Sequence, residues 1–231
     1  MTYILNIETA TKVCGVSISL NGELIDHIET NEGNSHSAKL APFIDKLLKS
    51  NNIEYSQLSA IAISKGPGSY TGLRIGTSTA KGLCYALDIP LIAVGSLDSM
   101  ASYAKSKYNK EFDGHFRPMI DARRMEVYSQ NFDNNLNPTD EVKPVIIDEN
   151  SFIEELNNYK VLFFGDGAMK CESTITHPNA IFYAETEASA LGMIILSYNK
   201  FIDNDFVDVA YFEPFYLKEF IAAVSKVKGL R

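Results

Sequence analysis

Short apolar runs separated by turn signals dominate the first part of the chain. Residues 3–9 have the composition of a buried strand, and residues 13–20 alternate Val, Ile and Leu with small residues. Asn21-Gly22 separates this second run from a third at residues 23–29. Because Asn-Gly between two such runs is a strong hairpin signal, the pattern predicts three strands, the last two joined by a tight turn.

A helical period replaces the strand pattern after residue 36. Residues 37–50 place five apolar side chains on one helical face: Leu40, Phe43, Ile44, Leu47 and Leu48. Pro42 is expected to kink this helix or to lie close to its first turn. There follow a strand at 60–64, a glycine-rich turn at 65–71, a helix at 72–87, a strand at 90–94 and a helix at 96–107. This order predicts a mixed sheet, antiparallel at one edge and parallel within.

The pattern in the second half of the chain predicts a smaller α/β unit. The polar stretch 109–114 predicts a boundary, so we expect an α/β fold of two subdomains, 1–108 and 109–231. The expected elements are a hairpin of strands 116–121 and 125–132, a strand at 143–147, a helix at 151–159, a strand at 161–165 and a helix at 188–201.

Composition limits the chemistry and the compartment. No apolar run approaches the ~20 residues needed to span a bilayer, and the N-terminus lacks the basic region of a signal peptide. The three cysteines, Cys14, Cys84 and Cys171, are far apart, which argues against a disulfide framework and a zinc knuckle. We therefore expect a cytoplasmic protein with no membrane contact.

The net charge of −8 bears on nucleic acid. A chain that binds RNA alone usually carries a face rich in Lys and Arg. Here Arg123-Arg124 is the only adjacent basic pair in the body of the chain, and the tail residues Lys218, Lys226, Lys228 and Arg231 form either a solvated face or a packed segment. The isolated chain should bind RNA weakly, so a partner would have to supply the positive surface.

The segment 65–83, KGPGSYTGLRIGTSTAKGL, is the most unusual in the sequence. Pro67 between two glycines predicts a tight turn, and Ser69 or Thr71 can cap the helix that follows. Three small residues share one stripe of this helix at a spacing of four: Gly72, Gly76 and Ala80. Such a stripe permits close backbone approach, either of the protein's own sheet or of a helix of a second protein.

Generic nucleotide and nucleophile motifs do not fit this segment. Lys81 is followed by Gly82, which rules out a Walker A ending. Pro67 and Thr71 stand where a nucleophile elbow would need glycines around Ser69.

The same segment closely resembles the signature of the bacterial TsaB family and, more loosely, that of its catalytic paralogue TsaD. Three further segments agree: NIETAT at 6–11, DARRMEVY at 121–128 and PFYLK at 214–218. The resemblance spans nearly the whole chain and is strongest over 60–100. It implies two ribonuclease-H-like subdomains of the actin, sugar-kinase and Hsp70 superfamily, the second reduced.

The resemblance also implies a function. TsaB proteins are non-catalytic, pair with TsaD through helices of the first subdomain and, with the ATPase TsaE, support threonylcarbamoyl transfer to adenosine in tRNA. By this resemblance tRNA is reached only through the complex, and a homodimer is expected in isolation. The expected partner interface comprises Leu40, Phe43, Leu47, Gly72, Leu73, Gly76, Thr79, Ala80 and Leu83. An autonomous kinase or peptidase of the same superfamily is the alternative.

The catalytic ligands of TsaD have no counterpart here. TsaD-like enzymes carry a His-x-x-x-His pair after the strand equivalent to 90–94, where this chain has Ser96 and Met100. A hydroxyl and a thioether make a poor site for a divalent metal. GDGA at 165–168 is the nearest remnant of a late nucleotide loop. We expect no catalytic residue, no metal and no cofactor.

Four residues remain as candidates for contact with an anion or a partner. Glu8 ends the first strand, where it either serves chemistry or hydrogen-bonds to the next turn. Asp121, Arg123 and Arg124 form either an internal ion pair at a hairpin tip or a binding site. The four histidines, His27, His36, His115 and His177, lack metal-ligand spacing.

Overall fold

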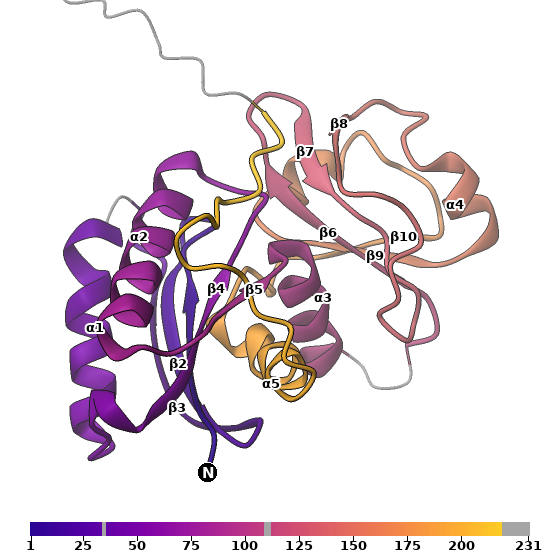
Figure 1. Cartoon of the computed structure of the whole chain (residues 1–231). Helices are drawn as coiled ribbons and strands as arrows, with labels where there is room; N and C mark the ends of the chain where they lie inside the picture. The colour runs from indigo at the N-terminus through magenta and orange to yellow at the C-terminus, as the bar shows by residue number, and fades with distance from the viewer. Residues whose placement is uncertain (34–35, 109–111, 219–231) are drawn as a thin grey trace, which may run out of the picture.

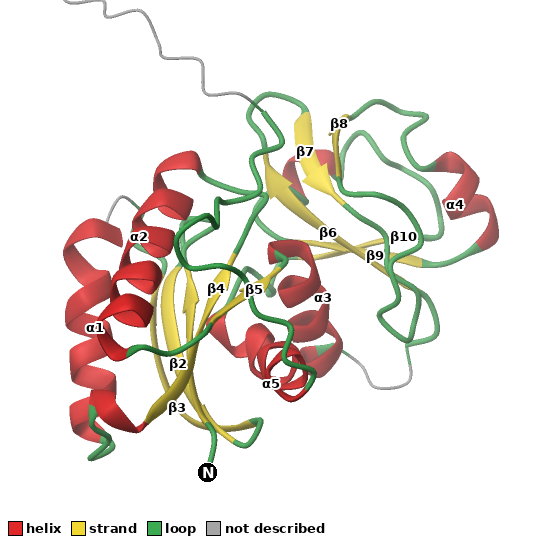
Figure 2. Ribbon diagram, in the orientation of Figure 1, coloured by secondary structure: helices red, strands yellow, loops and turns green. Residues whose placement is uncertain are grey.

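The computed structural model describes residues 1–33, 36–108 and 112–218 as two mixed sheets with helices packed around them (Figures 1 and 2). The strand orders are β3-β2-β1-β4-β5 and β10-β9-β6-β7-β8. The expected α/β fold is confirmed. The division after residue 108 stays a prediction, and Lys226, Lys228 and Arg231 lie outside the described residues.

The first sheet follows the predicted order. Its strands are β1 (Tyr3–Glu8), β2 (Cys14–Leu20), β3 (Glu23–Thr30), β4 (Leu58–Ser64) and β5 (Leu91–Val94). β1 pairs antiparallel with β2 and parallel with β4, which in turn pairs parallel with β5. Asn21 and Gly22, with φ of 51° and 83°, form the β2–β3 turn, as the Asn-Gly signal predicts.

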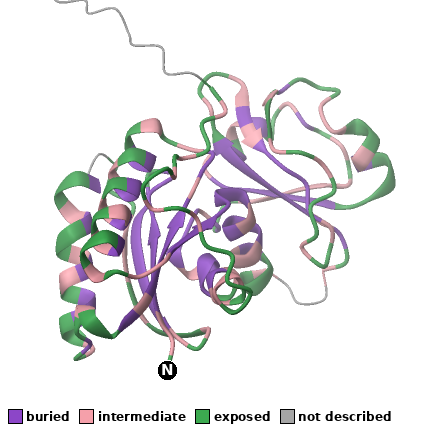
Figure 3. Cartoon of the chain, viewed as in Figure 1, coloured by how far each residue is buried: buried purple, intermediate pink, exposed green. Residues whose placement is uncertain are grey.

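Helices cover both faces of this sheet. Apolar residues of α1 (His36–Ser50) and α2 (Tyr70–Leu87) share one core with β1, β2 and β4, and Pro42 lies exposed inside α1. On the other face, α5 (Ile194–Ile202) and the short turn before it pack on Ile4, Ala62 and Ile92. Figure 3 shows the buried residues concentrated on the strands and the exposed ones on the outer sides of α1 and α2.

The second sheet is smaller and packs against α3 (Ser96–Lys107). Its elements are β6 (His115–Asp121), β7 (Glu126–Ser129), β8 (Lys143–Ile146), α4 (Ile153–Asn158), β9 (Val161–Phe164) and β10 (Ala180–Tyr183). The hairpin of β6 and β7 is confirmed. The strand β10 was not predicted from the sequence.

The helix expected at 188–201 begins differently. Residues Ala190–Met193 form a 3-10 turn, and only then does α5 start. A Cβ at Gly192 would lie 2.1 Å from the backbone oxygen of Ser99, so this turn is pressed against α3. Although α5 follows the second sheet in sequence, it belongs by packing to the first sheet.

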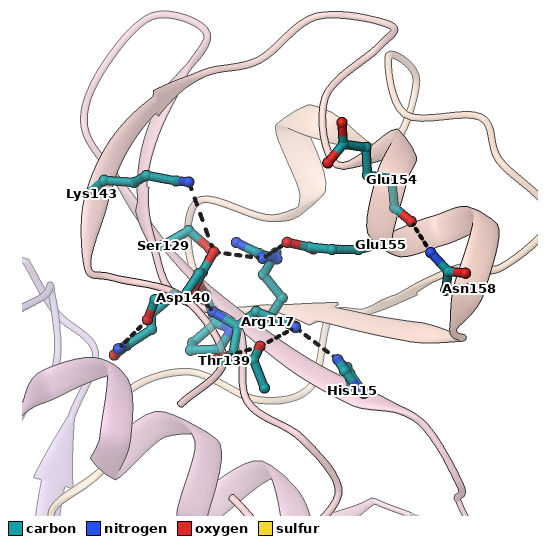
Figure 4. A network of polar contacts seen from close by, with 12 residues as sticks. His115, Arg117, Ser129, Thr139, Asp140, Lys143, Glu154, Glu155 and Asn158 are labelled. Atoms are coloured by element: carbon teal, nitrogen blue, oxygen red, sulfur yellow. Dashed lines mark hydrogen bonds and ion pairs between the residues drawn. The ribbon is translucent and has the colours of Figure 1, made fainter. Parts of the chain in front are cut away.

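A buried arginine organises the second sheet (Figure 4). Arg117 of β6 is fully buried, and its Nη2 donates to Asp140 Oδ2 at 2.9 Å and to Glu155 Oε1. Its guanidinium also lies 4.3 Å from the centre of the Phe152 ring. These contacts join β6, the loop before β8 and α4. Breaking such a buried pair is costly, because it leaves an uncompensated charge.

The segment after α5 runs back along the first sheet and reaches the second (Figure 1). Val207 N donates to Leu91 O at 2.9 Å, and Phe215 N donates to Lys65 O at 2.7 Å. Lys218 then pairs with Glu126 of β7. Residues 203–218 therefore tie the two sheets together, a role that explains the PFYLK segment.

The glycine stripe of α2 faces its own sheet. A Cβ at Gly72 would lie 2.1 Å from Thr9 O, and one at Gly76 would lie 2.2 Å from Thr9 Oγ1. Ala80 is fully buried on the same side. By contrast, a Cβ at Gly82 would meet nothing within 4 Å. Of the two interpretations of the stripe, packing on the protein's own sheet is the one that the structure supports.

Alanine at these two glycines should have opposite effects. Gly76→Ala should lower the free energy of unfolding by about 1–3 kcal/mol, because the new methyl group overlaps Thr9. Gly82→Ala should raise it by about 1 kcal/mol, because alanine is the better helix former and has room. Urea denaturation of both variants measures the difference. A stabilised Gly76→Ala would contradict the close contact with Thr9.

Candidate functional site

The turn between β4 and α2 is bonded tightly to its neighbours. Ser69 N donates to Ala10 O at 2.6 Å, and Gly66 N donates to Ser96 Oγ at 3.1 Å. A Cβ at Gly68 would lie 2.2 Å from Ala10 O. Ser69 caps α2 through an acceptor bond from Gly72 N. The N–H groups of Gly66 and Ser69, which a phosphate-binding loop would offer to its ligand, are thus used within the chain. Gly68 is needed because the turn packs closely on Ala10.

Glu8 lies fully buried at the end of β1. Its Oε1 accepts hydrogen bonds from Ala10 N at 2.7 Å and Ser64 Oγ at 2.9 Å. The pKa of Glu8 is raised to about 7, mainly by burial and also by the nearby Glu29 carboxylate, against the lowering effect of these hydrogen bonds. The carboxyl group therefore has a structural role: it holds the turn that follows β1 by hydrogen bonds.

The positions that replace the histidine pair are also part of the core. Ser96 and Met100 are fully buried; Ser96 accepts from Gly66 N, and the Met100 methyl group packs on Gly165. GDGA forms a turn in which Gly167 N donates to Met119 O at 3.0 Å. Within residues 1–33, 36–108 and 112–218, no three His, Cys, Asp or Glu side chains are grouped to hold a metal ion.

A hollow of about 310 Å³ opens between the end of β3, α3 and the segment before the 3-10 turn Ala190–Met193. Glu29, Glu185 and Glu187 line it together with Asn31 and Tyr103. Glu29 is fixed there by Ser189 Oγ at 2.8 Å and Ala190 N at 2.7 Å. Three carboxylates around one hollow would repel the phosphates of a nucleotide.

The structure corrects most of the expected partner interface. Six of its residues are buried against the protein's own sheet, where no partner can reach them: Leu40, Leu47, Gly72, Leu73, Gly76 and Ala80. Phe43, Thr79 and Leu83 are half-buried at the rim. The physical reason is that the small residues of α2 accommodate Thr9 at the end of β1.

The same two helices leave a different surface open, here called the α1–α2 face. It consists of Ala41, Pro42 and Lys46 on α1 and of Arg74, Ser78, Gly82 and Tyr85 on α2. Tyr85 is 88% exposed. These residues were not predicted as an interface, although Arg74, Ser78, Gly82 and Tyr85 recur at helical spacing on the side of α2 opposite its apolar face.

The remaining candidates lie on the β6–β7 hairpin. Arg123 and Arg124 are exposed at its tip and have positive φ values of 71° and 48°. Asp121 accepts from Arg123 N at 2.9 Å and pairs with Lys170. The expected internal ion pair thus forms with Lys170 rather than with an arginine, and Glu8, buried in the first subdomain, takes no part in this group.

Among the described residues, no helix combines the length and the apolar character of a membrane span. The family model described as TsaD, tRNA N6-adenosine threonylcarbamoyltransferase, matches residues 24–222. A protein of Haemophilus influenzae named tRNA threonylcarbamoyladenosine biosynthesis protein TsaB is 27% identical over 93% of each chain. The Bacillus subtilis protein of the same name is 38% identical, over 54% of this chain and about half (53%) of its own length.

Solved structures agree on the fold. An uncharacterized protein with similarity to peptidase YEAZ from Pseudomonas aeruginosa superposes with a TM-score of 0.83 at 22% identity, over 94% of this chain and 100% of that one. YeaZ from the same organism gives 0.79 at 23% identity, over the same shares. The family model covers well over half of the sequence. The chain therefore belongs to the family that this model describes, and within it to the TsaB (YeaZ-like) proteins.

Proposed function

We propose that this chain is a non-catalytic scaffold subunit that pairs with TsaD, and with TsaE, for threonylcarbamoyl transfer to adenosine in tRNA. The names of its relatives place them in the biosynthesis of threonylcarbamoyladenosine in tRNA. The observation that carries the scaffold role is the α1–α2 face, where an exposed glycine and an exposed tyrosine lie one turn apart.

Gly82 has no internal reason to be glycine. Its neighbours Gly72 and Gly76 are required by Thr9, but a side chain at Gly82 would extend into open space. A glycine inside a helix costs about 1 kcal/mol relative to alanine. A second helix that packs closely on this face would account for the cost, and Tyr85 beside it is the residue type that anchors interfaces.

A non-catalytic role agrees with the residues at the former ligand positions. Ser96 and Met100 pack in the core, and Glu8 is fully buried, so none of the three is available to a substrate. The chain would then act by shaping its partner rather than by performing chemistry. On this proposal it works in the cytoplasm, forms a homodimer when alone and meets tRNA only within the complex.

An autonomous kinase or peptidase is the competing function. It would require turnover of ATP or cleavage of a peptide by the isolated chain. No feature of the described residues favours it over the scaffold role.

Gly82→Gln should separate folding from partner binding. Glutamine is a good helix former, and the space at this position is open, so the variant should melt no lower than the wild type. Its side chain should hold a partner helix away and weaken association with TsaD at least ~10-fold, equivalent to about 1.4 kcal/mol. Size-exclusion chromatography with light scattering, together with nucleoside analysis of modified tRNA, measures both effects.

Tyr85→Ala should weaken the same association by about 2 kcal/mol without loss of fold. Ser106→Gln, an exposed position on α3, is the matched control and should leave association unchanged. If both variants of the α1–α2 face bind TsaD normally, the interface lies elsewhere.

Glu8→Gln should remove a pH dependence of stability and leave tRNA modification intact. The folded pKa of about 7 lies above the ordinary value of 4.5, so Glu8 destabilises the fold progressively as the pH rises through that window. Glutamine can accept both hydrogen bonds without a charge. In urea denaturation, the free energy of unfolding of the variant minus that of the wild type should increase by about 2–3 kcal/mol between ~pH 5 and ~pH 8. A constant difference, or loss of modification by a folded variant, would overturn this role of Glu8.

A further inference from the structure

The tip of the β6–β7 hairpin holds two arginines in a backbone conformation that disfavours them. Arg123 and Arg124 both have positive φ, at 71° and 48°, and both are exposed. A side chain other than glycine costs about 1–2 kcal/mol per residue in the left-handed region. Strain of this kind persists at positions that clamp a ligand more often than elsewhere.

The base of the hairpin is fixed, so the tip presents its side chains from a rigid platform. Lys170 Nζ donates to Arg124 O and to Glu126 O, each at 2.7 Å, and also to the Asp121 carboxylate. A rigid base reduces the entropy lost when the two arginines bind.

Two of the carboxylates near the tip are already paired with lysines. Asp121 pairs with Lys170, and Glu126 pairs with Lys218. Within the part of the chain that the structure describes, neither guanidinium has an ion-pair or hydrogen-bond partner. Both positive charges are therefore available.

The surroundings of the tip are positive although the chain as a whole is negative. The positively charged residues connected to the hairpin are Arg123, Arg124, Lys170, Lys218 and Lys12. The negatively charged ones are Asp121, Glu126 and Asp166. A local excess of positive charge in a chain of net charge −8 marks this hairpin as a place where an anion is attracted.

We propose that Arg123 and Arg124 bind phosphates of an RNA backbone, which is that of the tRNA when the chain is part of its complex. This inference rests on the proposed function. A guanidinium matches a phosphate with two parallel hydrogen bonds and stays charged at all physiological pH values. Two such contacts are too few to hold tRNA alone, which agrees with the weak binding expected of the isolated acidic chain.

The double variant Arg123→Asn/Arg124→Gly tests this without endangering the fold. Asn and Gly both tolerate positive φ, so the variant should melt no lower than the wild type. In the assembled complex with TsaD, its tRNA affinity should fall about 5- to 50-fold at ~100 mM salt. The slope of log K against log salt should decrease by about 1–2, because up to two phosphate contacts are lost. Arg123→Lys/Arg124→Lys, which keeps both charges, should retain the slope.

Lys143→Gln/Lys160→Gln is the matched control. It removes the same charge at the end of the second sheet opposite the hairpin tip. There Lys143 lies across from Ser129 in the β7–β8 ladder, and Lys160 immediately precedes β9. The control should leave affinity and slope unchanged. A folded hairpin variant that binds tRNA like the wild type overturns the proposal. So does one that no longer assembles, because the tip would then contact a protein. Failure of the wild-type chain to assemble with TsaD would instead overturn the proposed function, and this inference with it.

Discussion

The close approach of α2 to the end of β1 is the contact on which the rest of the first subdomain depends. With Thr9 O only 2.1 Å from the Cβ position of Gly72, no side chain fits between helix and strand. The same approach brings the turn before α2 within hydrogen-bond distance of Ala10, so Ser69 N can donate to it. Glycine weakens the helix locally, and the packing of apolar side chains in the shared core offsets that weakness.

The segment that follows the second sheet is held on the first sheet by polar contacts that a sequence does not display. Ser197 of α5 donates to Asn6 Oδ1 at 2.6 Å, and Ser17 donates to Ala190 O at 3.0 Å, all in the buried interior. Because these buried polar groups hydrogen-bond to each other, none of them loses its water contacts without a replacement partner. These contacts hold α5 and the turn before it on the first sheet, and the ion pair of Lys218 with Glu126 ties the end of the same segment to the second sheet.

The two positions that the resemblance aligns with the histidine pair of TsaD are packing positions in this chain. Ser96 accepts a hydrogen bond from Gly66 N and so connects the turn before α2 to the start of α3. Met100 fills the space beside Gly165. On the proposed function, the surfaces that matter are instead outside: the α1–α2 face toward a protein and the β6–β7 hairpin toward RNA.

The sequence by itself determined the order of the elements, the mixed first sheet, the Asn-Gly hairpin and the family, because these depend on local periodicity, turn chemistry and a long specific segment. It also singled out Arg123 and Arg124. It did not determine which side of α2 faces inward: a stripe of Gly72, Gly76 and Ala80 suits a partner helix as well as the protein's own sheet. Nor did it predict β10, the 3-10 turn before α5 or the burial of Arg117, which depend on residues far apart in the chain. Only the tertiary structure decided these points, because close contacts such as that of Gly76 with Thr9 exist only once distant segments have packed.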